Sequence, residues 1–169
     1  MSTGMFLDTN NLYHRVRKKF GDTQKIDYGV LLDKLAEQFG ELGHKAAYGV
    51  QINGKSQAFI GWLAFRGFET HYYDLHLTEE HRGQTKIPRL HMPTILAIHA
   101  LSKVTNDPSA FDTIILGTAE PTFKILAKQL TYMGFKVVIV GCDVPDDLRE
   151  AATEVIEIDE TLLEAGKDG

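Results

Sequence analysis

Apolar residues in this chain fall into short continuous runs separated by stripes at helical spacing. The runs predict buried strands at 5–7, 45–52, 68–77, 113–116, 136–140 and 154–158. The stripes predict helices at 12–20, 28–40, 56–65, 93–104, 121–132 and 146–152. Because strands alternate with helices, we expect an α/β fold, a three-layer sandwich with a mainly parallel central sheet and right-handed crossovers.

The length of 169 residues suits one domain with its own core, which we expect at 1–164, followed by a frayed tail at 165–169. The polar segment 76–90 interrupts the alternation of strands and helices. Loops of this length inside a compact domain are often functional. Its cations Lys86 and Arg89 are therefore candidate contacts to a bound anion, and a solvated surface loop is the alternative.

Charge and cysteine content limit the classes of partner. The formal net charge is −5, with 23 acidic and 18 basic residues, so any nucleic-acid binding requires a local basic patch. The single cysteine, Cys142, excludes an internal disulfide and fits a reducing compartment. No apolar run approaches the length of a membrane span, and the start lacks the pattern of a secretory signal. We expect a cytoplasmic protein with no membrane partner.

Motifs for the common nucleotide and nucleophile sites are absent from the sequence. No strand is followed by Gly-x-Gly-x-x-Gly, and there is no Walker loop and no Gly-x-Ser-x-Gly. Polar residues instead follow three expected strands: Asp8, the segment 118–122 with Glu120, and Asp143. Because parallel strands end at one edge of a sheet, Asp8 and Glu120 are expected to meet there. Two carboxylates suit Mg²⁺ or Mn²⁺.

Each of these polar residues also has an interpretation without chemistry. Asp8 is suited to cap the helix expected at 12–20, and Glu120 is a favourable acid at a helix N-terminus. Thr118 and Thr122 are suited to cap that second helix. The residues alone leave both interpretations open.

Three segments resemble a known family. Residues 6–13, Phe-Leu-Asp-Thr-Asn-Asn-Leu-Tyr, resemble the opening motif of NYN domains, a branch of the PIN-like nucleases in which a strand ends in Asp followed by Asn-Leu-Tyr. Residues 115–123, with the helix and strand after them, are similar to the family's Ser-Gly-Asp-x-Asp-Phe block. Residues 148–158 are similar to the family's closing helix and strand. The resemblance implies a PIN-like, Rossmann-like fold and metal-dependent hydrolysis of RNA.

The resemblance assigns roles and shows departures. It implies that Asp8 and Glu120 hold the metal and take part in catalysis. Thr122 stands where the family has a second acid, and His99 stands where a helix acid is expected. An earlier helix acid of the family falls near 92–93, where this chain has Met and Pro. His99 is therefore a candidate catalytic residue or ligand, with a half-buried helix histidine as the alternative.

The substrate expected from the resemblance is RNA, with single strands favoured. Candidate substrate contacts are Asn11, Tyr13, Thr118, Thr122, Lys86 and Arg89. A homodimer is compatible with the sequence. The rival hypothesis is a catalytically degenerate domain that binds RNA or protein, because two of about four family acids are missing. A phosphatase-like hydrolase is disfavoured, since the first strand lacks Asp-x-Asp.

Overall fold

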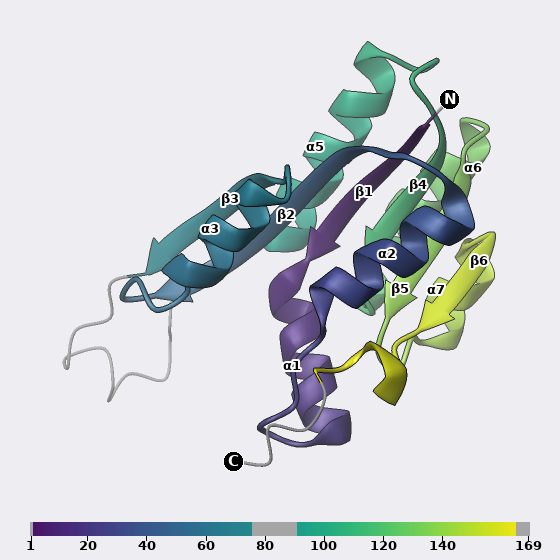
Figure 1. Ribbon diagram of the computed structural model, residues 1–169. Helices are drawn as coiled ribbons and strands as arrows, with labels where there is room; N and C mark the ends of the chain where they lie inside the picture. The colour runs from purple at the N-terminus through teal and green to yellow at the C-terminus, as the bar shows by residue number, and fades with distance from the viewer. Residues whose placement is uncertain (1, 76–90, 165–169) are drawn as a thin grey trace.

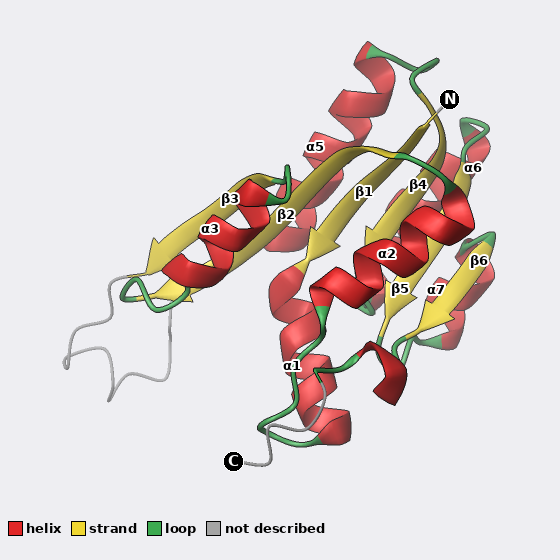
Figure 2. Cartoon of the chain, viewed as in Figure 1, coloured by secondary structure: helices red, strands yellow, loops and turns green. Residues whose placement is uncertain are grey.

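The computed structural model describes residues 2–75 and 91–164. The predictions for the 76–90 segment, including Lys86 and Arg89, and for the tail at 165–169 lie outside the described residues. Six strands form one sheet in the order β3-β2-β1-β4-β5-β6 (Figure 2). Their bounds are β1 Ser2–Asp8, β2 Leu42–Ile52, β3 Glu69–Leu75, β4 Phe111–Gly117, β5 Lys136–Gly141 and β6 Glu154–Glu157.

Helices cover both faces of the sheet. Three of them, α1 Thr9–Phe20, α2 Tyr28–Phe39 and α3 Gln57–Phe65, lie on one face. On the other lie α5 Met92–Asn106, α6 Lys124–Tyr132 and α7 Asp146–Ala151 (Figure 1). Two short 3₁₀ turns complete the description, η1 Pro121–Phe123 and η2 Glu160–Leu162. The predicted α/β three-layer sandwich is confirmed.

Every strand pair in this sheet is parallel, whereas the sequence predicted a mainly parallel one. An isolated antiparallel bridge between Ile26 and Leu163 lies outside the strands. Parallel strands covered on both faces are expected to be apolar throughout, and β5 has only its first residue exposed. The strand predicted at 68–77 is described over Glu69–Leu75.

Two predicted α-helix starts differ from the structure by three residues, and both lie at the candidate site. The first helix begins at Thr9 rather than Leu12, because the Asp8 side chain accepts the Asn11 N–H and so caps the helix directly at the end of β1. The helix predicted at 121–132 is divided into η1 and α6. The Phe123 N–H bonds the Glu120 carbonyl three residues back, which is 3₁₀ spacing.

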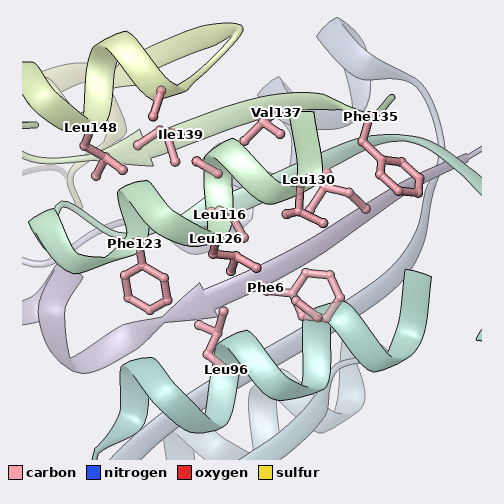
Figure 3. Close-up of a cluster of buried hydrophobic side chains, with 14 of the residues drawn as sticks. Phe6, Leu96, Leu116, Phe123, Leu126, Leu130, Phe135, Val137, Ile139 and Leu148 are labelled. Atoms are coloured by element: carbon pink, nitrogen blue, oxygen red, sulfur yellow. The ribbon is translucent and has the colours of Figure 1, made fainter. Parts of the chain in front are cut away.

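The core is divided by the sheet into two layers. Alternate residues of β1 contribute to each layer: Phe6 packs toward α5 and α6, and Met5 and Leu7 pack toward α1 and α2. Figure 3 shows Phe6 among the side chains of the first layer, with Leu96 of α5. The two layers hold the carboxyl ends of the strands in fixed positions, and the candidate site lies there.

Candidate functional site

The candidate site lies where the sheet changes direction. From β1 the chain adds β2 and β3 on one side, and it then crosses to add β4, β5 and β6 on the other. Asp8 ends β1, and the segment Thr118–Glu120 follows β4, its neighbour. In open α/β sheets, ligands bind at this switch point, outside the carboxyl ends of the strands. The fold therefore brings Asp8 and Glu120 to the edge where the sequence placed them.

Asp8 is a buried carboxylate, with only 4% of its surface exposed. Its Oδ1 accepts a hydrogen bond of 3.2 Å from the Asn11 backbone N–H, so the capping interpretation is confirmed. The pKa of Asp8 is raised to about 6, mainly by burial; backbone N–H groups of α1 oppose this rise, and the nearby charge of Glu120 adds to it. The cap consists of a hydrogen bond from the backbone to one carboxylate oxygen, and this bond does not prevent the carboxylate from having a second role at the site.

The loop that carries Glu120 is tied to α1 by side chains. Asn11 Oδ1 accepts a 2.9 Å hydrogen bond from the Ala119 N–H. The guanidinium of Arg15, one turn further along α1, donates to the Ala119 carbonyl at 3.0 Å. Thr118 Oγ1 accepts from the Glu120 N–H at 3.0 Å, which makes it a turn-stabilising residue before η1. Sequence reasoning found Asn11 and Thr118, but it missed Arg15, whose partner lies 104 positions away.

His99 has its contacts on the neighbouring strands β2 and β3. Its Nδ1 lies 3.0 Å from the Tyr48 hydroxyl, and its ring meets the His71 ring edge-on at 4.6 Å. Burial and then His71 lower the pKa of His99, which favours the neutral ring. The charges acting on it are His71 and Glu69, while the charge acting on Asp8 is Glu120. His99 is half-buried, and its catalytic role stays a prediction.

Two candidate substrate contacts are exposed on the elements that follow the two acids. Tyr13 lies in α1, is 42% exposed, and has the Arg17 guanidinium 4.9 Å above its ring. Thr122 is exposed in η1, the turn that follows Glu120. A ring and a cation on one helix face can contact a base and a phosphate of a single strand.

Asp143 follows β5 at the same sheet edge but belongs to a different cluster. Lys19 donates to its carboxylate at 2.8 Å, and this hydrogen bond lowers the pKa of Asp143. A hollow of about 810 Å³ lies beside it, lined among others by Lys19, Arg149 and Glu157. The Asp143 carboxylate is thus already paired with a cation.

Within residues 2–75 and 91–164, no three His, Cys, Asp or Glu side chains are grouped so as to hold a metal ion. The acidic pair Asp8 and Glu120 is what this chain offers to a cation there. Mg²⁺ and Mn²⁺ are commonly held by one or two carboxylates, with water and substrate phosphate supplying the remaining oxygens. The pair fits that requirement. Among the helices described here, none is both long and apolar enough to span a membrane.

A parallel, doubly wound domain with an acidic pair at its switch point has the architecture of PIN-like nucleases. The NYN domain profile matches residues 2–159, so the chain belongs to the NYN domain family, a family of PIN-like nucleases that are typically metal-dependent. The resemblance to the NYN family is therefore confirmed. A comparison with curated proteins finds no match for this chain.

A solved structure supports the fold. A protein of unknown function from Vibrio parahaemolyticus is 21% identical, covers 96% of each chain and superposes with a TM-score of 0.76. A hypothetical protein of solved structure is 15% identical over 94% of this chain and 69% of its own, with a TM-score of 0.30. The first likeness shows that this arrangement of strands and helices is shared.

Proposed function

We propose that this NYN domain cleaves RNA phosphodiesters with the aid of Mg²⁺ or Mn²⁺, and that Asp8 and Glu120 are its metal-holding catalytic carboxylates. One observation carries the proposal. Asp8 is buried at the switch point, and Glu120, on the loop after the neighbouring strand, is close enough for its charge to add to the rise that burial causes in the pKa of Asp8. Two acids that repel each other in one site are a common arrangement where a cation is to be bound.

The pKa of Asp8 determines the pH at which such a site can bind a cation. A carboxyl group must lose its proton before it can hold a metal, so protons and metal compete at Asp8. With a pKa of about 6, Asp8 is largely protonated at pH 5 and ionised at pH 7. A bound divalent cation would polarise the phosphodiester and lower the pKa of an attacking water.

Several other residues complete the proposed site. Tyr13 and Thr122 are exposed on the elements that follow the two acids and are proposed contacts for a single strand, together with Asn11, Lys86 and Arg89. Thr118, the remaining candidate, is fully buried and would act on the strand through the turn that it stabilises. Stacking on Tyr13 requires an unpaired base, which favours single-stranded RNA. His99 remains a proposed catalytic residue because its neutral ring is suited to accept a proton.

Metal removal tests this function. The purified protein is expected to cleave a fluorescently labelled single-stranded RNA in Mn²⁺ or Mg²⁺. Cleavage should stop in EDTA and resume when the metal is restored. The rate at limiting metal should rise between pH 5 and 7, because Asp8 deprotonates in that range. The matched duplex should be cut more slowly. Cleavage that continues at the same rate in EDTA would contradict the proposal.

A second candidate function is a catalytically degenerate domain that binds RNA or protein. It is favoured by Thr122 in place of the second acid and by the contacts of His99 with Tyr48 and His71. Calorimetry discriminates between the two. A site-specific Mn²⁺ isotherm that disappears in Asp8→Ala supports the nuclease, whereas RNA binding without metal heat or cleavage supports the degenerate domain.

A further inference from the structure

We propose that Asn11 and Arg15 are positioning residues that clamp Ala119 and thereby hold Glu120 beside Asp8. The inference rests on the proposed function, since it assigns Glu120 to the metal-holding pair. Asn11 and Arg15 are four residues apart in α1, so their side chains lie on the same face of the helix. Both reach the one residue that precedes Glu120.

The clamp forms hydrogen bonds with two successive peptide groups. Asn11 Oδ1 accepts the Ala119 N–H at 2.9 Å, which fixes the peptide between Thr118 and Ala119. Arg15 donates to the Ala119 carbonyl at 3.0 Å, which fixes the next peptide, between Ala119 and Glu120. The N–H of that second peptide bonds Thr118 Oγ1 at 3.0 Å. Both polar ends of the peptide entering Glu120 are thus bonded.

The peptide leaving Glu120 is fixed as well. Its carbonyl accepts the Phe123 N–H at 3.1 Å and closes the η1 turn. Below the loop, Gly141 of β5 allows a close approach, because a Cβ at this position would lie 2.6 Å from the Thr118 carbonyl oxygen. With the backbone held on both sides, the Glu120 carboxylate is free to move only through its own side-chain torsions.

Asn11 links the two acids directly. Its backbone N–H donates to Asp8 Oδ1 at 3.2 Å, while its side chain holds Ala119. Asp8 and Glu120 lie at the ends of neighbouring strands, and two like charges repel each other, so a loop without such bonds would relax by moving Glu120 away. The clamp opposes that movement through two hydrogen bonds to the backbone of Ala119, and Arg15 makes its bond to a carbonyl rather than to either carboxylate.

The test is a carboxyl NMR titration of Asp8 in the metal-free full chain. The Glu120→Gln variant sets the reference, because removing this charge must lower the pKa of Asp8 from about 6. We expect Asn11→Ala and Arg15→Met to lower it in the same direction, by no more than the shift that Glu120→Gln produces. Asn11→Ala leaves the backbone N–H that caps Asp8 in place, and the control Arg66→Met alters an arginine whose ring partner is Trp62 of α3.

The direction in which the pKa of Asp8 shifts distinguishes release of the Glu120 loop from the direct effect of losing the Arg15 charge. Removing the positive charge of Arg15 from an unmoved site would raise the pKa of Asp8, whereas release of Glu120 lowers it. Amide exchange at Ala119 and Glu120 should accelerate about tenfold in both variants, because local opening becomes easier. Arg15→Lys, which keeps the charge and a donor, should recover part of both effects.

Two results would overturn the inference. One is an Asn11→Ala protein that is folded and has the wild-type Asp8 pKa and Ala119 exchange rate. The other, which covers the case where Asn11→Ala does not fold, is an Arg15→Met protein with a raised Asp8 pKa and unchanged exchange. Neither readout uses metal or RNA. A shifted pKa in a protein that cuts no RNA would therefore retain the clamp and reject the proposed function.

Discussion

An Asp8→Asn variant is expected to lose RNA cleavage and, at pH 7, to be more stable than the wild-type protein. The loss follows from the proposed role, because a neutral amide cannot hold a divalent cation as a carboxylate does, and activity should fall by about a hundredfold or more. The gain in stability follows from burial. Asparagine can still accept the Asn11 N–H as an N-cap, and it removes a charge that burial and Glu120 disfavour.

The change in the pKa of Asp8 on folding determines whether its contribution to stability rises or falls with pH. Asp8 has a pKa near 3.8 when unfolded and about 6 when folded, so the folded state binds its proton more tightly. Stability from this group is complete below pH 3.8, decreases as the pH rises toward 6, and stays low above that value. A rise of about two pKa units corresponds to about 3 kcal/mol at neutral pH. The advantage of Asp8→Asn should therefore vanish near pH 4.

Urea denaturation at pH 4 and pH 7, together with the RNA assay, measures both effects. The matched control is Asp112→Asn, an exposed aspartate at the opposite end of β4 from the candidate site. It should change neither stability nor cleavage. An Asp8→Asn protein that is less stable than wild type at pH 7 and still active would show that Asp8 serves as a structural cap alone.

A Phe6→Ala variant is expected to lose about 3–5 kcal/mol of unfolding free energy, which is a large share of what a domain of this size has. Phe6 is fully buried on β1 and packs in the core layer beneath α5 and α6. Its ring also lies 5.3 Å from the ring of His44. Truncation removes the apolar area and leaves a cavity in the central strand that ends in Asp8.

The control for this substitution is Phe65→Ala, the same change at a residue that is 86% exposed at the end of α3. A surface position of this kind should change the unfolding free energy by less than about 0.5 kcal/mol. Urea denaturation of both variants gives the comparison. If Phe6→Ala cost no more than Phe65→Ala, the assignment of the β1 side chains to the two core layers would be incorrect.

Local patterns in the sequence were sufficient for the fold and for half of the site. The apolar runs predicted all six strands, and the rule that parallel strands share an edge correctly placed Asp8 and Glu120 at one edge of the sheet. The element ends were less accurate. The cap by Asp8 starts α1 three residues earlier than predicted, and a 3₁₀ turn divides the helix predicted from Pro121.

The remainder of the site depends on contacts between distant parts of the chain. Arg15 meets Ala119 only because α1 lies across the end of β4, and no residue near Arg15 in the sequence indicates that partner. His99 could be placed on a helix by its spacing, but the position of α5 along the sheet decides that it meets Tyr48 and His71. A helical repeat gives the buried face of a helix and not its displacement along the strands.

By itself, the sequence determined the class of fold, the layers of the core, the family motifs and the pair of acids, because periodicity and strand-end chemistry are local properties. Only the tertiary structure decided that Asp8 is buried, that Glu120 raises its pKa, and that Asn11 and Arg15 hold the loop between them. Burial, charge proximity and long-range hydrogen bonds depend on packing across more than a hundred positions of the chain, and no local pattern encodes them.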